Sequence, residues 1–313
     1  MKYYFKKIAG LVITMFLVSL ATFAVFQLMP QNPAEIILGV NAEPEQIIAL
    51  EKELQLNLPP LTRYFNWIKN LFKGDLGMSY RYHQPVSGLI SSAFGVTAGL
   101  SVLSILLTIL IGIPMGIFLS MKHSEKTAVI LSVISQMGLS IPSFCIGIML
   151  ISVFSVWLKL VPSMGYTAFS VNPIEYLKTM ILPSVAISIG SSAILMRYVK
   201  VCIENEKQQP YVKTARSKGF SQSKILKKHI LRNSLVPAIT MLGMLVADIL
   251  GGSIIIENVF SLPGIGKLIA TSIATRDLPL IQGLVLYLAV IVVICNFLVD
   301  MLYSLIDPRI RVK

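Results

Sequence analysis

The hydrophobic positions of this chain are gathered into long runs that few charged residues interrupt. A helix needs roughly 20 mostly apolar residues to cross a bilayer, and it satisfies its own backbone hydrogen bonds there, as hydrocarbon requires. Six runs meet this length and predict an all-α integral membrane protein with six transmembrane helices. They lie at about 8–29, 93–120, 127–158, 180–198, 235–256 and 280–305.

Two of these runs have special features. The first is longer than the apolar core of a signal peptide and continues past the poor cleavage sequence ATFA at 21–24, so we expect an uncleaved first span. The third contains Pro142, which predicts either a kinked helix or two helical segments.

The basic residues predict the orientation. With both termini placed inside, the inner segments hold 18 Lys and Arg residues and the outer segments hold 9. Lys and Arg are retained on the cytoplasmic side of membrane proteins. Both termini are therefore expected in the cytoplasm, with a long extracytoplasmic loop at 30–92 and a cytoplasmic loop at 199–234.

The predicted outer loop 30–92 has the composition of an ordered segment. Pro44 stands at a plausible first helical position, and residues 60–72 repeat apolar side chains at helical spacing. This apolar stripe predicts either a helix on the membrane surface or packing against the spans. The stripe consists of Leu61, Tyr64, Phe65, Ile68, Leu71 and Phe72.

The predicted inner loop 199–234 is polar, strongly basic and helix-forming. Pro210 is suited to begin a helix and Gly219 to end it in a left-handed C-terminal cap. Ser221 then predicts the N-cap of a second helix that runs to about Asn233. Two short helices joined at a glycine make a compact projection suited to docking on another protein.

Composition supports the membrane assignment and argues against nucleic acid as a partner. The chain is 55% hydrophobic and 13% charged, whereas soluble domains carry about 25% charged residues. Its net charge is +12. Retention of Lys and Arg on the cytoplasmic side explains this excess, so no nucleic-acid contact is expected.

No pattern in the chain predicts catalysis, a metal site or a bound cofactor. The sequence PGIGKL at 263–268 lacks the first glycine and the final Ser or Thr of an ATP-binding loop. The three histidines stand in different loops, and the three cysteines have no metal-binding spacing. We therefore expect neither an enzyme nor a metal protein.

Polar residues inside the spans suggest a transport route. Asp248 lies deep in the fifth run, where a charge faces either an aqueous path or a structural partner. Ser184, Ser188 and Ser192 share one face of the fourth run, and their hydroxyls either pack or line a wet route.

Small residues at four-residue spacing predict close helix packing. One pair is Gly112 and Gly116 in the second run, and another set is Gly243, Ala247 and Gly251 in the fifth. For these small residues we favour helix packing over a role in lining the transport route.

The inner segment 210–240 reads PYVKTARSKGFSQSKILKKHILRNSLVPAIT. It resembles the ATPase-coupling loop of ABC importer permeases, whose general pattern is Glu-Ala-Ala, three further residues and Gly. Lys213-Thr214-Ala215 and Gly219 occupy that spacing, with Lys in place of the Glu. The stretch is similar to the form in dipeptide/oligopeptide/nickel permeases, TARxKG followed by RHxLRN, with Lys228 in place of the first Arg.

Four more motifs extend this resemblance over essentially the whole chain. They are GDLGMSY at 74–80, LSIPSF at 139–144, VFSLPGIGKL at 259–268 and LIDPRIR at 305–311. The long outer loop resembles that of the first of the two permeases in such importers.

The resemblance implies a multi-pass permease of a bacterial or archaeal cell (inner) membrane that forms half of a translocation pathway. It also implies its partners: a second homologous permease, one or two cytoplasmic ABC ATPases and an extracytoplasmic solute-binding protein, besides membrane lipid. ATP would bind to the ATPases, so this chain needs no cofactor. The residues it implies for ATPase coupling are Thr214, Ala215, Arg216, Gly219, His229, Arg232 and Asn233.

The substrate class stays open between nickel or a metal chelate and di- or oligopeptides. Glu257-Asn258 stands where peptide permeases often have Glu-Thr, which resembles the nickel branch. On this basis we favour nickel or a metal chelate over peptides.

Two other function classes compete with this interpretation. A stand-alone secondary transporter or channel is expected to show more intramembrane charge or paired broken helices, and the chain has no clear internal repeat. An intramembrane enzyme is expected to show a catalytic grouping, and none is present in the sequence.

Overall fold

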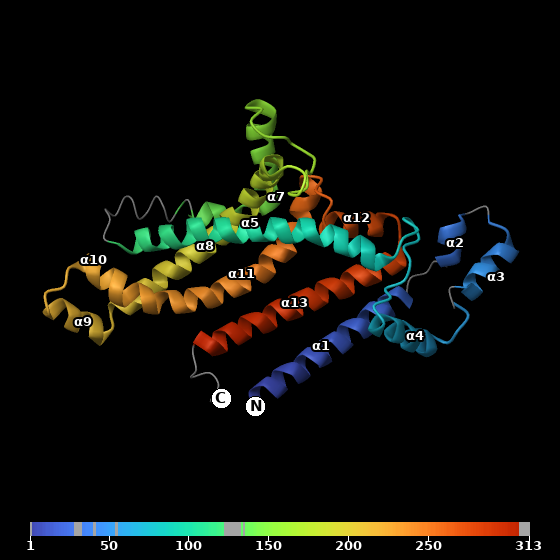
Figure 1. Ribbon diagram of the computed structural model, residues 1–313, viewed down its shortest axis with the longest axis horizontal. Helices are drawn as coiled ribbons and strands as arrows, with labels where there is room; N and C mark the ends of the chain where they lie inside the picture. Colours follow the sequence, from blue (N-terminus) through green and yellow to red (C-terminus); the bar gives the residue numbers. More distant parts are fainter. Residues whose placement is uncertain are drawn as a thin grey trace. The chain divides into compact units, whose positions relative to one another are not determined.

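A computed structural model describes residues 2–27, 33–39, 42–53, 56–121, 133 and 135–306 (Figure 1). These residues are nearly all helical, and their only extended pairing is an isolated bridge between Met78 and Pro85. The chain forms two compact units, each described separately below. The first unit contains residues 1–95 and 267–294, and the second contains residues 96–266 and 295–313.

Five helices of the described residues are long and apolar enough to cross a membrane. They are α1 (Lys2–Gln27), α5 (Val86–Ser120), α8 (Pro173–Lys207), α11 (Leu231–Val259) and α13 (Leu278–Ile306). The predicted all-α membrane fold is thus confirmed, while the count of six spans stays a prediction.

The predicted third span is interrupted where the structure describes it. Residues 135–140 are helical, and α7 (Ser143–Leu150) then continues into a π-helical segment, η1 (Ile151–Trp157). Pro142 stands between them with an extended ψ of 141°. Proline has no N–H to donate and clashes with the preceding turn. Of the two alternatives, the structure therefore has two helical segments rather than one kinked helix. Residues 127–132 of this predicted span lie outside the described residues.

In the second unit, α8 packs against both α11 and α7. Helix α5 also approaches α8 closely, because a Cβ atom at Gly112 would lie 3.0 Å from Leu195 and one at Gly116 would lie 2.7 Å from the Met196 carbonyl oxygen. The packing role predicted for this glycine pair is confirmed. At Gly251 on α11 a Cβ atom would meet nothing within 4 Å among the described residues, so the packing role of Gly243, Ala247 and Gly251 stays a prediction.

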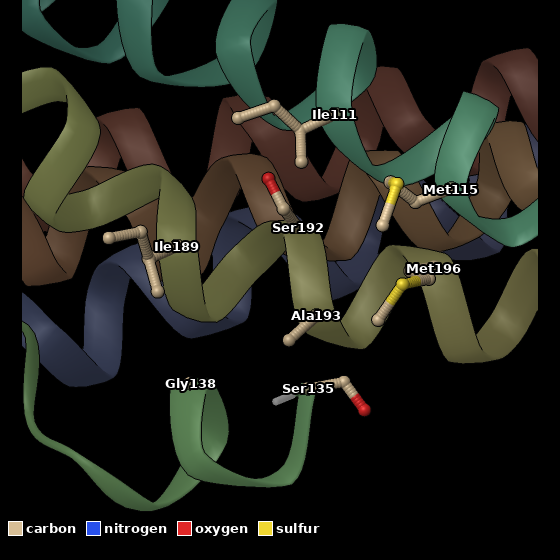
Figure 2. Close-up of a pocket in the computed structure, with 8 residues that line it drawn as sticks. All are labelled: Ile111, Met115, Ser135, Gly138, Ile189, Ser192, Ala193 and Met196. Carbon is tan, nitrogen blue, oxygen red and sulfur yellow. The ribbon is translucent and has the colours of Figure 1, made fainter. Parts of the chain in front are cut away.

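A small cavity lies between α5, α8 and the helical residues 135–140 (Figure 2). Its volume is about 160 Å³, and apolar side chains such as Ile111, Met115 and Ile189 line it. Ser192 of α8 contributes a hydroxyl to this lining (Figure 2).

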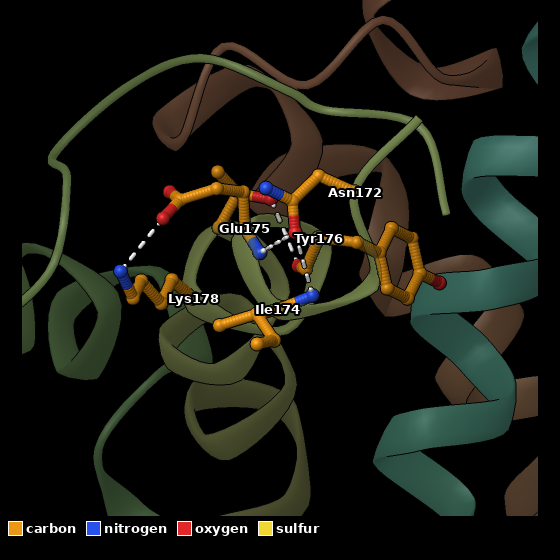
Figure 3. A network of polar contacts seen from close by, with 6 residues as sticks. Asn172, Ile174, Glu175, Tyr176 and Lys178 are labelled. Atoms are coloured by element: carbon orange, nitrogen blue, oxygen red, sulfur yellow. Dashed lines mark hydrogen bonds and ion pairs between the residues drawn. The ribbon is translucent and has the colours of Figure 1, made fainter. Parts of the chain in front are cut away.

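Helix α8 begins at a side-chain cap (Figure 3). The Asn172 side-chain oxygen accepts hydrogen bonds from the backbone N–H groups of Ile174 (3.1 Å) and Glu175 (3.2 Å). Pro173 follows at the first helical position, where its missing N–H costs nothing. Lys178 then pairs with Glu175 one turn further on (2.6 Å).

In the first unit, three short helices fill the predicted outer loop: α2 (Pro33–Leu38), α3 (Pro44–Glu53) and α4 (Pro60–Phe72). Helix α4 packs on α1, with the Tyr64 and Phe23 rings 5.3 Å apart and the Ser19 and Tyr64 hydroxyls 2.9 Å apart. Leu61, Phe65 and Phe72 of the same predicted stripe are exposed. The predicted packing on a span is therefore found at Tyr64, while a position of this helix on the membrane surface stays a prediction.

Candidate functional site

The predicted coupling loop consists mainly of helix. It contains the end of α8, then α9 (Pro210–Ser217), α10 (Gln222–Ile225) and the π-helical η2 (Leu226–Ile230), which leads into α11. Pro210 stands at the beginning of α9, as the sequence predicts.

Gly219 adopts the left-handed backbone conformation that its position after α9 predicts. Its φ is +80°, its N–H donates to the Arg216 carbonyl (2.9 Å), and the Phe220 N–H donates to the Ala215 carbonyl (3.3 Å). A Cβ atom at Gly219 would meet nothing within 4 Å. The backbone angle alone, and not a lack of space, therefore favours glycine here.

Two predictions about the second helix are wrong. Ser221 precedes α10 but its side chain makes no capping bond; the Ile225 N–H closes the turn on the Ser221 carbonyl instead (3.0 Å). The helix also does not end at Asn233, since residues 222–259 form one continuous helical stretch of 38 residues. No glycine or extended residue breaks the chain between Asn233 and Pro237, and helices tolerate a proline inside a membrane span.

Asn233 instead joins a polar triad with Glu206 and Tyr211. The Tyr211 hydroxyl donates to the Glu206 carboxylate, and the Asn233 amide donates to the Tyr211 oxygen (3.1 Å) and to Glu206 (3.3 Å). Burial raises the pKa of the Tyr211 phenol, and the bond to Glu206 raises it further, so the phenol stays a donor. The triad ties α8, α9 and α11 together.

The remaining predicted coupling residues divide into a buried and an exposed set. Ala215 of α9 is buried, together with its neighbour Val212, which was not among the predicted residues; both pack against apolar residues of the second unit such as Ile203 and Ile225. Thr214, Arg216 and Arg232 are exposed, while the ring of His229 stacks on Phe220 at 6.2 Å. The segment therefore presents an exposed basic surface on a packed apolar base.

Helix α11 presents one uncovered face within the membrane span. Met244, Asp248, Gly251 and Ile255 are all exposed and recur at alternating spacings of four and three residues. We call these four residues the α11 stripe. Asp248 makes no hydrogen bond or ion pair with the described residues. The adjoining face of the helix, about 100° around its axis, is buried at Leu245, Ile249 and Ile256.

The structure does not bring the three candidate serines onto this face. Ser184, Ser188 and Ser192 are buried at 0%, 0% and 4% exposure. Ser188 donates to the Val185 carbonyl (3.1 Å), whereas the hydroxyls of Ser184 and Ser192 have no hydrogen-bond partner among the described residues. The role of these serines in a route stays a prediction.

Glu257, which the sequence linked to the solute, is a structural residue of the turn after α11. Its carboxylate is fully buried and accepts the Gly266 N–H (2.6 Å). A Cβ atom at Gly264 would collide with that carboxylate. The neighbouring Ile265 N–H donates to the Thr97 hydroxyl (2.9 Å). The glycines of the PGIG sequence thus allow the backbone to pass directly against the buried Glu257 carboxylate.

Sequence reasoning missed Glu206 and Tyr211, and neither carries a local signal. The triad arises from residues 5 and 22 positions apart that meet only after three helices have packed. Among the described residues, no group of three or more His, Cys, Asp or Glu side chains is placed to hold a metal ion.

Comparison with known proteins identifies the family. Residues 112–312 match the profile of the binding-protein-dependent transport system inner membrane component, and residues 1–101 match that of the N-terminal part of such membrane components. The chain belongs to this family of ABC importer permeases, as its motifs predict. It is thus a multi-pass inner-membrane permease component rather than a stand-alone secondary transporter or channel.

Named relatives extend over nearly the whole chain. A protein of Brucella abortus (strain 2308) named "Putative peptide transport system permease protein" is 37% identical over 98% of both chains. The glutathione transport system permease protein GsiC of Escherichia coli (strain K12) is 33% identical over 100% of both chains.

Solved structures support the fold. The inward-facing MetNI methionine ABC transporter matches with a TM-score of 0.59 at 17% identity, covering 70% of this chain and 96% of its own. An amino acid ABC transporter matches with a TM-score of 0.56 at 16% identity, covering 70% and 94%.

Proposed function

We propose that this chain forms one half of the translocation pathway and that the α11 stripe lines it, opposite a second homologous permease. The observation that carries the proposal is the exposure of Asp248 on a membrane-spanning helix whose adjoining face is buried. A carboxylate in lipid is costly, so this face needs water or another protein subunit beside it.

The proposed solute is a short peptide. Relatives that match the full length are named for peptide and glutathione transport, which supports this class. The sequence preference for nickel rested on Glu257-Asn258. Because the Glu257 carboxylate binds the Gly266 N–H, these residues give no support to a metal chelate.

The proposed ATPase contact is the exposed basic surface of α9 and α10. ATP hydrolysis takes place in partner ATPases, and their closure moves α9 and, through the polar triad and the continuous helix, α11. The exposure of Arg216 and Arg232 above the buried Val212 and Ala215 supports a docking role. The excess of basic residues supports a cytoplasmic location for this surface and both termini.

The test is thiol labelling of the purified complex, with its partner subunits, in a background lacking Cys145, Cys202 and Cys295. Gly251→Cys, which has room for a side chain, is expected to react with a charged, water-soluble reagent and to be protected by transported peptide. Phe16→Cys on the exposed apolar face of α1 is the control and is expected to stay unlabelled. In the same complex, Asp248→Asn is expected to reduce peptide uptake without loss of assembly. An unreactive residue 251 together with normal uptake by Asp248→Asn would contradict the proposal.

A further inference from the structure

The segment that precedes α5 in the first unit is a closed and well-bonded loop. The Ser79 N–H donates to the Gln84 carbonyl (3.0 Å), the His83 N–H to the Ser79 carbonyl (3.1 Å), and the Val86 N–H to the Gly77 carbonyl (3.0 Å). Gly77 and His83 take positive φ angles of 85° and 50°. We call residues 77–86 the 77–86 loop.

Asp277, which directly precedes α13, holds this loop in place through hydrogen bonds. Its carboxylate is 1% exposed and accepts the Ser79 hydroxyl (2.5 Å) and the backbone N–H groups of Tyr80 (3.1 Å) and Arg81 (3.2 Å). It also accepts the Leu280 N–H in the first turn of α13 (3.4 Å). A buried carboxylate is stable only when donors surround it, so the acid and the loop hold each other in place.

The side chain of Tyr80 adds no second charge beside the buried carboxylate. Burial raises the pKa of its phenol to about 12, and the nearby Asp277 carboxylate contributes to the same shift. The phenol is therefore neutral at physiological pH.

The side chains at the tip of the loop, in contrast, are exposed. Residues 81–85 are all exposed, and Met78 is exposed at 52% and Tyr82 at 37%. Arg, Tyr and Met are enriched in protein–protein interfaces. A fixed backbone that presents such side chains loses little conformational entropy on binding, which favours a partner that must dock repeatedly.

The chemistry of the tip favours a soluble protein over lipid. Arg81, His83 and Gln84 form a basic and polar surface around a single aromatic ring, and transient interfaces are more polar than permanent ones. On the proposed orientation the loop faces the outside, where a binding-protein-dependent permease meets its solute-binding protein.

We propose that the tip of the 77–86 loop, held in place by Asp277, docks an acidic surface of the solute-binding protein through Arg81 and Tyr82. This inference rests on the proposed function and orientation. Arg81 and Tyr82 are contact residues, and Asp277 is a positioning residue that acts through the loop backbone.

The experiment measures ATPase activity of the complete complex in proteoliposomes against the concentration of loaded solute-binding protein. Arg81→Glu is expected to raise the half-saturating concentration roughly tenfold, with basal and maximal activity unchanged. Added salt is expected to weaken docking of the wild-type complex more than docking of the variant. Lys73→Glu makes the same charge change at an exposed residue outside the loop and is expected to behave as wild type.

Asp277→Asn provides the second arm, because an amide cannot accept all of these donors and presents N–H groups to some of them. It is expected to raise the half-saturating concentration and to make the 77–86 loop a site of limited proteolysis, while the complex still assembles. If both variants keep the wild-type half-saturating concentration, docking at this loop is refuted and the proposed function stands. If Arg81→Glu lowers the basal rate without binding protein, the loop contacts the partner permease instead, which also refutes the inference. Failure of any binding protein to stimulate the wild-type complex would contradict the proposed function itself.

Discussion

Among single residues, Gly219 shows how backbone conformation can fix an amino acid where space does not. Its φ of +80° lies in the left-handed region, although a side chain would have room. A β-branched residue is strained there, at a cost of about 1–2 kcal/mol. Relaxing that strain requires α10 to move relative to α9.

We therefore expect Gly219→Val to insert and assemble normally but to lose peptide uptake, because ATP hydrolysis no longer couples to the pathway. Gly219→Asn is the matched control, since asparagine tolerates the left-handed conformation. Uptake and peptide-stimulated ATPase activity are measured side by side in the reconstituted complex. Wild-type values of both for Gly219→Val would show that this junction is not the coupling element.

Single residues also show which features of the structure could be predicted from the sequence. Pro210 and Gly219 were found because proline has a fixed φ that suits the first turn of a helix, and glycine takes the positive φ of a helix end without strain. Their positions are therefore informative without any tertiary structure. Ser221 was placed correctly, but its hydroxyl does not cap, because a serine at that position only permits a cap. Asp277 gave no signal, since its partners at 79–81 are nearly 200 positions away.

Among the helices, the predicted end at Asn233 fails for a physical reason. Asparagine was read as the end of a soluble helix, but its amide is engaged by Glu206 and Tyr211 on neighbouring helices. The helix continues, and its 38 residues extend about 57 Å at 1.5 Å per residue. That length exceeds the bilayer core, so one continuous helix is long enough to reach from the proposed coupling surface through the membrane.

The polar triad gives a prediction for these helices. Tyr211→Phe removes the phenol bonds to Glu206 and Asn233, each worth about 1 kcal/mol. We expect peptide uptake to fall while ATPase activity persists, so that more ATP is hydrolysed per peptide. Tyr166→Phe, outside the triad, is the control.

A double-mutant cycle separates the triad from general destabilisation. Glu206→Gln alone is expected to uncouple in the same way, and the double variant with Tyr211→Phe is expected to be no worse than either one. Additive losses, or equal losses of uptake and ATPase activity, would contradict a joint role of these residues.

For the whole molecule, hydropathy predicts which residues lie in the hydrocarbon core of the membrane, but it does not predict where the helices end. Helix α8 runs over 35 residues, beyond the predicted 180–198, because its polar end VKVCIENEK continues as helix outside the apolar run. The predicted third span is not among the five long apolar helices of the described residues. Pro142 interrupts it, and part of it lies outside those residues. Pro142 indicated the interruption in the sequence, whereas the apolar pattern gave no sign that α8 continues beyond its apolar run.

The orientation of the whole chain yields a labelling prediction. In a cysteine-less background, Lys52→Cys in α3 is expected to react with an impermeant thiol reagent from outside intact cells. Ser223→Cys in α10 is expected to react only after the membrane is opened. Both positions are exposed, so a missing reaction cannot be attributed to burial. The reverse pattern would overturn the assignment of both termini to the cytoplasm.

The π-helical turns of η2 have a consequence for the long helix that follows them. A π-helical turn holds about one residue more than an α-helical turn, and each residue of an α-helix accounts for about 100° of rotation. If Leu226–Ile230 relaxed to α-helical winding, every side chain of α11 would turn through about that angle relative to α10. Asp248 and Gly251 would then leave the face they now occupy, and Ala247 and Leu250, which directly precede them in the helix, would move onto it. A change of winding over five residues would thus act as a rotary switch between a polar and an apolar wall.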